Sequence, residues 1–96
     1  MTSEQLIREL ESTYSRCLAT AKKKNADYAD NDDPFRNFKM SLFVGVSPQR
    51  AILVRLSDKI SRISNLLDRE AKVKDEKIED TIEDAINYLA LLKAML

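Results

Sequence analysis

The sequence predicts an all-α fold, a small bundle of three main helices with a loop-rich insertion after the first helix. Apolar residues recur every three or four positions over three long segments, which is the period of an amphipathic helix. The chain has one glycine and two prolines, fewer turn-forming residues than a β-sheet of this size usually needs. Its 96 residues fit one domain, residues 1–96, with a modest core.

Composition excludes several classes of function. Sixteen basic and sixteen acidic residues cancel, so no overall field favours DNA, RNA or an anionic membrane as a partner. No apolar run approaches the roughly 20 residues of a membrane span, and the first residues lack the pattern of a signal peptide. Cys17 is the sole cysteine and histidine is absent, which disfavours disulfides and zinc chemistry and suits a cytoplasmic protein.

The first helix is predicted from about residue 3 to the mid-twenties. Thr2 and Gln5 fit a capping box at its start. Cys17 falls on the apolar stripe, so we expect a core residue and not a nucleophile. Lys22-Lys23-Lys24 either complement the negative end of the helix dipole or hold a phosphate. The apolar stripe consists of Ile7, Leu10, Tyr14, Cys17 and Ala21.

Residues 27–38 interrupt the helical pattern with turn formers around Pro34. The acids there resemble a calcium loop only loosely, because the central glycine and terminal glutamate are missing. Tyr28, Phe35 and Phe38 are expected to pin this loop to the bundle, or alternatively one of them stacks on a base. Residues 39–46 fit either a short helix or a buried connector, and the pattern does not decide.

The second main helix is predicted from Pro48 to about residue 71, with Ser47 as its N-cap and Pro48 in its first turn. Asp75 is expected to cap the last helix after a short link. A short link makes the two helices antiparallel neighbours. The residues expected to be buried on the second helix are Leu53, Leu56, Ile60, Ile63 and Leu67.

The last helix, about residues 76–96, carries apolar residues on two sides. Asp80, Asp84 and Asn87 share the face opposite its main stripe, and this face becomes apolar at Tyr88 and beyond. Such a helix needs cover on both sides, so we expect the chain to form an oligomer. The acids should then lie at the edge of a covered cleft. The main stripe consists of Ile78, Ile82, Ala85, Leu89, Leu92 and Leu96.

The second and last helices offer one cationic and one acidic face. The simplest interpretation is a lattice of solvated salt bridges, each worth about 0–1 kcal/mol. The functional alternative is that Asp80 and Asp84 hold Mg²⁺ while cations on the second helix bind phosphates, since Mg²⁺ takes one or two carboxylates plus substrate oxygens. The cations concerned are Arg55, Lys59 and Arg62.

Four short motifs, in this order and spacing, resemble a phage and bacterial family called nucleotide modification associated domain 1. The motifs are Lys24-Asn25-x-x-Tyr28, Asn37-Phe38, Arg55-x-x-Asp58-Lys59-x-x-Arg62 and Asp80-Thr81-x-x-Asp84-x-x-Asn87-Tyr88. The family is similar to the all-α MazG-like nucleoside triphosphate pyrophosphohydrolases, and the likeness runs from about residue 22 to residue 92. In those enzymes an EExxE helix and an ExxD helix bind Mg²⁺.

The resemblance implies a site in which Asp80 and Asp84 match the second metal element as DxxxD, while the first element is missing. On the middle helix only Asp58 could ligate a metal, and its cations favour holding phosphates. The implied metal ligands for Mg²⁺ are therefore Asp58, Asp80 and Asp84. The implied nucleotide-binding residues are Lys24, Asn25, Tyr28, Asn37, Phe38, Arg55, Lys59, Arg62, Asn87 and Tyr88.

Three functions follow as alternatives. The first is a nucleotide-binding protein of MazG-like type that performs Mg²⁺-dependent pyrophosphohydrolysis of a nucleoside triphosphate. The second is a non-catalytic phage protein, acting in the host cytoplasm, that sequesters a cyclic nucleotide signal and so blocks host defence. The third is a structural helical oligomer without a ligand. The sequence specifies neither the nucleotide nor the choice between catalysis and sequestration.

Overall fold

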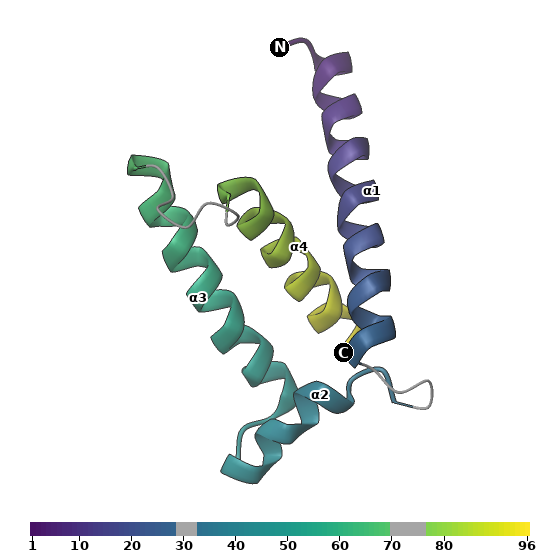
Figure 1. Cartoon of the computed structure of the whole chain (residues 1–96), viewed down its shortest axis with the longest axis vertical. Helices are drawn as coiled ribbons and strands as arrows, with labels where there is room; N and C mark the ends of the chain where they lie inside the picture. The colour runs from purple at the N-terminus through teal and green to yellow at the C-terminus, as the bar shows by residue number, and fades with distance from the viewer. Residues whose placement is uncertain (29–32, 70–76) are drawn as a thin grey trace.

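The computed structural model describes residues 1–28, 33–69 and 77–96, and these form helices without any strand. The elements are α1 (Ser3–Tyr28), α2 (Arg36–Lys39), the 3₁₀ helix η1 (Met40–Val44), α3 (Pro48–Asp68) and α4 (Ile78–Met95). The all-α prediction is therefore confirmed, with α2 and η1 forming part of the insertion. Helix α4 lies between α1 and α3 and runs antiparallel to α3, as predicted (Figure 1). None of the described helices is long and apolar enough to cross a membrane.

Helix α1 begins at the predicted capping box. The Thr2 amide donates to Gln5 Oε1 at 2.8 Å, and the Gln5 amide donates to Thr2 Oγ1 at 3.1 Å. The helix continues to Tyr28, farther than the expected mid-twenties. Lys24 consequently lies inside α1 and not in its last turn, so the dipole offers it no special stabilisation there.

The insertion between α1 and α3 is built around Asp33 and Phe38. Asp33 accepts hydrogen bonds from the Phe35 amide at 3.2 Å and from Lys39 Nζ at 2.8 Å. The Lys39 hydrogen bond lowers the pKa of Asp33. Phe38 is only 9% exposed, which agrees with the predicted pinning of the insertion to the bundle.

Residues 39–46 are not the buried connector that the sequence left open. Most of them form η1, which ends at Gly45 in the left-handed conformation (φ 72°) that favours glycine. Phe43 and Val44 are 85% and 78% exposed. A short 3₁₀ turn on the surface cannot bury a face of its own, so these apolar side chains stay in solvent.

Helix α3 starts as predicted, because Ser47 Oγ accepts a hydrogen bond from the Arg50 amide at 3.2 Å and Pro48 follows. The helix is described to Asp68, and its expected end at residue 71 and the Asp75 cap lie outside the described residues. The predicted burial of the α3 stripe is wrong for three of its members. Ile52, beside the stripe, is fully buried instead, so α3 is rotated relative to the prediction. The exposed members are Leu53 (47%), Ile60 (54%) and Leu67 (73%).

The core of the described chain is small. Its buried apolar side chains are Cys17, Phe38, Ile52 and Ala85, joined by Thr81. Cys17 therefore occupies the predicted core position. Burial, and after it the Glu83 carboxylate, raises the pKa of the Cys17 thiol and keeps it protonated. A protonated buried thiol suits packing better than nucleophilic chemistry.

Candidate functional site

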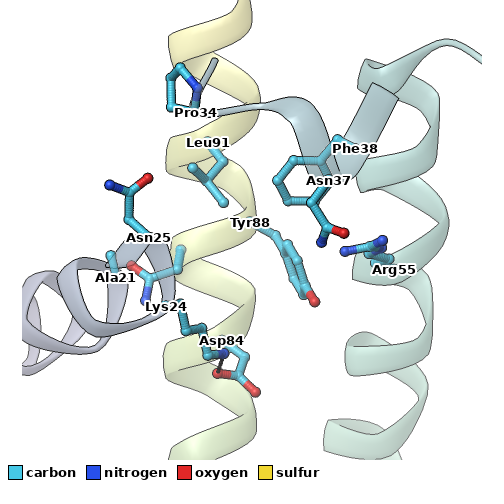
Figure 2. A pocket seen from close by; sticks show the side chains of 11 residues that line it. Ala21, Lys24, Asn25, Pro34, Asn37, Phe38, Arg55, Asp84, Tyr88 and Leu91 are labelled. Atoms are coloured by element: carbon cyan, nitrogen blue, oxygen red, sulfur yellow. Dashed lines mark hydrogen bonds and ion pairs between the residues drawn. The ribbon is translucent and has the colours of Figure 1, made fainter. Parts of the chain in front are cut away.

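A pocket of about 340 Å³ opens where α1, α2, α3 and α4 converge (Figure 2). Its volume lies within the range of roughly 300–1,000 Å³ typical of small-molecule sites. The lining mixes amides, aromatic rings, aliphatic groups and three charged side chains. The lining residues are Ala21, Lys24, Asn25, Pro34, Asn37, Phe38, Arg55, Asp84, Asn87, Tyr88 and Leu91.

The structure brings together seven of the ten predicted nucleotide-binding residues. They come from all four of the sequence motifs and all four α-helices. Lys59 reaches this group through Asp84, whereas Arg62 lies farther along α3 and is not part of the lining. The side chain of Tyr28 lies outside the described part of the structure. The seven that line the pocket are Lys24, Asn25, Asn37, Phe38, Arg55, Asn87 and Tyr88.

Sequence reasoning missed the aliphatic wall of the pocket, namely Ala21, Pro34 and Leu91. Ala21 was assigned to the core stripe of α1 and Pro34 to a turn, and both assignments are compatible with a place at the pocket. Leu91 could have been predicted from the second apolar face of α4. That face, expected to need cover, contributes Tyr88 and Leu91 to the pocket.

Asp84 is held by two lysines from different helices. Its Oδ1 lies 3.2 Å from Lys24 Nζ of α1, and its Oδ2 lies 3.1 Å from Lys59 Nζ of α3. The Asp84 side chain is 25% exposed, so these pairs are screened less than fully exposed ones. Both carboxylate oxygens thus already have cationic partners.

The three predicted metal ligands are not gathered in this arrangement. Asp84 lines the pocket, but Asp58 and Asp80 are exposed and lie outside the lining. Among the described residues, no three histidine, cysteine, aspartate or glutamate side chains are grouped as a metal ion would require. Asp58, Asp80 and Asp84 thus do not form one group of three ligands, and Mg²⁺ binding through one or two of them stays a prediction.

The two aromatic residues of the pocket differ in what they offer a ligand. The Arg55 guanidinium lies over the Phe38 ring, 4.8 Å from its centroid, a cation–π arrangement that occupies one face of the ring. Tyr88 is half-buried and extends from α4 toward Arg55 on α3 (Figure 2). Phe38 therefore fixes Arg55 in place, while Tyr88 is the better placed ring for a flat ligand.

Three asparagines line the pocket, and one of them is structural. Asn87 Nδ2 donates to the backbone oxygen of Cys17 at 3.0 Å, which links α4 to α1. Asn25 and Asn37 are exposed, and their amides make no hydrogen bond with the described residues. These two side chains retain their donors and acceptors for a ligand.

The pocket thus combines a positive balance of charge with a ring and spare amides. Comparisons with protein-family models, curated proteins and solved structures found no match to this chain. Chemically, the arrangement can hold an anion through Arg55 and Lys24 and a planar group through Tyr88.

Replacing Asn87 with aspartate tests the link between α4 and α1. The new carboxylate faces the Cys17 carbonyl without a proton to donate, so we expect a loss of about 1–3 kcal/mol in the free energy of unfolding. Urea unfolding at one fixed protein concentration measures it. Asn37→Asp is the matched control and should change stability by less than about 0.5 kcal/mol, because its amide is exposed. Equal losses in the two variants would contradict this role of Asn87.

Proposed function

We propose that this pocket binds a phosphorylated nucleotide. The single observation that carries the proposal is the convergence of cationic, aromatic and amide side chains from four helices on one cavity. Each chemical part of a nucleotide has a counterpart there. The resemblance of the four motifs to a nucleotide-related family supports the same conclusion independently of the geometry.

In the proposed complex, the phosphates lie near Arg55 and Lys24. Arginine offers a planar fork of donors that matches phosphate oxygens, and Phe38 holds this fork from one side. The base packs against Tyr88, where stacking on an aromatic ring is worth about 1–3 kcal/mol per base. Asn25 and Asn37 supply polar contacts to the base or the sugar.

Asp84 occupies the place of an anion within this cationic group. Without a ligand, its carboxylate neutralises part of the charge of Lys24 and Lys59. A bound phosphate competes with Asp84 for Lys24, whose side chain is 53% exposed and can move toward the pocket at little cost. Binding in this account exchanges an internal ion pair for a ligand ion pair.

Holding the nucleotide intact is favoured over hydrolysing it. The EExxE element is missing from the sequence, and of the carboxylates at positions 58, 80 and 84 only that of Asp84 lines the pocket. Sequestration of a cyclic or linear nucleotide needs only the binding groups. Mg²⁺-dependent pyrophosphohydrolysis is the second candidate, supported by the position of Asp84 at the pocket beside the proposed phosphate groups.

Substitution of Arg55 by glutamine tests the phosphate contact. We first expect the unmodified protein to gain thermal stability from at least one member of a panel of nucleoside triphosphates, cyclic mononucleotides and cyclic dinucleotides, because a ligand of the folded state raises the midpoint. Arg55→Gln should then lower the affinity for that ligand by about tenfold or more, since a charge-assisted hydrogen bond is lost. Isothermal titration calorimetry gives both affinities.

Arg50→Gln is the matched control, because Arg50 is exposed at the start of the same helix and outside the lining. Each titration is repeated in EDTA and in Mg²⁺, with mass spectrometry of the recovered nucleotide. Intact ligand in both conditions supports sequestration, and release of pyrophosphate in Mg²⁺ supports the enzyme. Lack of any thermal shift, or equal affinities of the two variants, would refute the pocket as a nucleotide site.

Substitution of Asp84 by asparagine tests whether its carboxylate acts as an internal anion that competes with the phosphate or as a metal ligand. Removing one negative charge about 4 Å from the phosphate position should tighten binding roughly fivefold, the effect of about 1 kcal/mol of Coulomb repulsion in water. Asp80→Asn, one helical turn away and exposed, should leave the affinity unchanged. If Asp84→Asn instead binds the nucleotide more weakly than the unmodified protein in Mg²⁺ but not in EDTA, Asp84 is a metal ligand. Calorimetry in both conditions distinguishes the two outcomes.

A further inference from the structure

The apolar stripe of α1 is covered at one end only. At about 100° per residue, its members fall within an arc of about 80° on the helix surface. Cys17, toward the covered end, is 3% exposed and its Sγ approaches the Glu83 carbonyl of α4 at 3.9 Å. The members before it stand in solvent, where α1 extends beyond the start of α4 (Figure 1). They are Ile7 (53%), Leu10 (37%) and Tyr14 (57% exposed), and Leu6 beside them is 45% exposed.

The start of α1 has little cover from the described part of the chain. All residues from 1 to 12 are exposed, yet the helix is formed from Ser3 onward. Isolated helical segments shorter than about 12–15 residues are marginal in water, and most helical stability comes from packing of an apolar face. A regular helix with an intact apolar stripe at this position indicates a packing partner.

Helices α3 and α4 also leave apolar side chains exposed. Leu53, Ile60 and Leu67 recur every seven residues, the heptad period of a helix–helix seam, but they are 47–73% exposed. Leu89 on α4 is 53% exposed. Each main helix therefore packs one side within the chain and leaves an apolar seam partly uncovered.

The total exposed area measures how much cover is missing. The chain exposes 7650 Å², whereas a compact monomer of its 11.0 kDa mass exposes about 5,600 Å². The radius of gyration is 15.2 Å, compared with about 12.5 Å for a compact domain of this length. The excess of roughly 2,000 Å² per chain falls in the range of obligate interfaces between subunits.

We infer that the α1 stripe before Cys17 is an interface that packs against the apolar seams of a second copy of this chain. The partner must be present whenever the chain folds, because the described residues bury four apolar side chains, which are too few to stabilise a domain of this size alone. Another copy is the one molecule that is always available at that moment. Symmetric self-association is also the commonest form of assembly in soluble proteins.

The test compares two glutamate substitutions on opposite sides of α1. Leu10→Glu places a charge in the stripe, and Ala19→Glu places the same charge on the exposed polar side. Sedimentation velocity without nucleotide should give the unmodified chain a mass of at least twice 11.0 kDa. Leu10→Glu should shift it toward the single-chain mass, and Ala19→Glu should not. A folded single chain at micromolar concentration, or an unchanged mass for Leu10→Glu, overturns the inference.

A second measurement covers the case in which Leu10→Glu does not fold. The unfolding midpoint of the unmodified protein should rise with protein concentration, because association and folding are coupled. A midpoint that stays constant over a hundredfold concentration range contradicts the inference, whatever the variant does. Neither readout involves the pocket, so failure of the nucleotide proposal and failure of this inference are told apart.

Discussion

The carboxylate of Asp84 is the point on which the three main helices depend. Lys24 of α1 and Lys59 of α3 each pair with one of its oxygens, so α4 is tied to both neighbours through a single side chain. Arg16 adds a second tie between α1 and α4 at 3.2 Å from Glu83. Pairs of this kind contribute about 0–1 kcal/mol each, so they set the relative position of the helices more than they stabilise them.

This arrangement explains why the pocket lies where it does. Aligning α1 and α3 on Asp84 leaves a space above it, which α2 closes with Phe38 and Asn37 (Figure 2). Lys24, which pairs α1 with α4 through Asp84, is also one of the two cations that a phosphate would meet in the proposed complex. Structure and proposed binding therefore share Lys24 and Asp84, and a gain of ligand affinity on replacing Asp84 is expected to cost some of the order between helices.

Features set by neighbouring residues could be predicted from the sequence. The capping box of Thr2 and Gln5 and the Ser47 cap depend on three-residue contacts, and both form as predicted. The motifs also contain most of the residues that line the pocket. Cys17 was placed in the core by its position on a stripe alone.

Features set by distant residues could not be predicted. Lys24 and Asp84 are 60 residues apart, and the sequence around Asp84 does not indicate which lysine its carboxylate will pair with. The rotation of α3 that buries Ile52 and exposes Leu53 depends on how α4 fits against it. The apolar stripe of α1 stands exposed before Cys17, and no described part of the chain covers it. Sequence periodicity predicts that an apolar face of a helix will be buried, but not which element or molecule packs against it.

In the proposed complex, one ligand touches all four α-helices around Asp84. The most direct measurement is a titration of the ¹⁵N-labelled protein with its tightest nucleotide, following the side-chain amide signals of the asparagines by NMR. We expect shifts for Asn25 of α1, Asn37 of α2 and Asn87 of α4, together with the backbone around Arg55, while Asn65 near the far end of α3 stays unchanged. Shifts confined to one helix, or centred on Asn65, would contradict it.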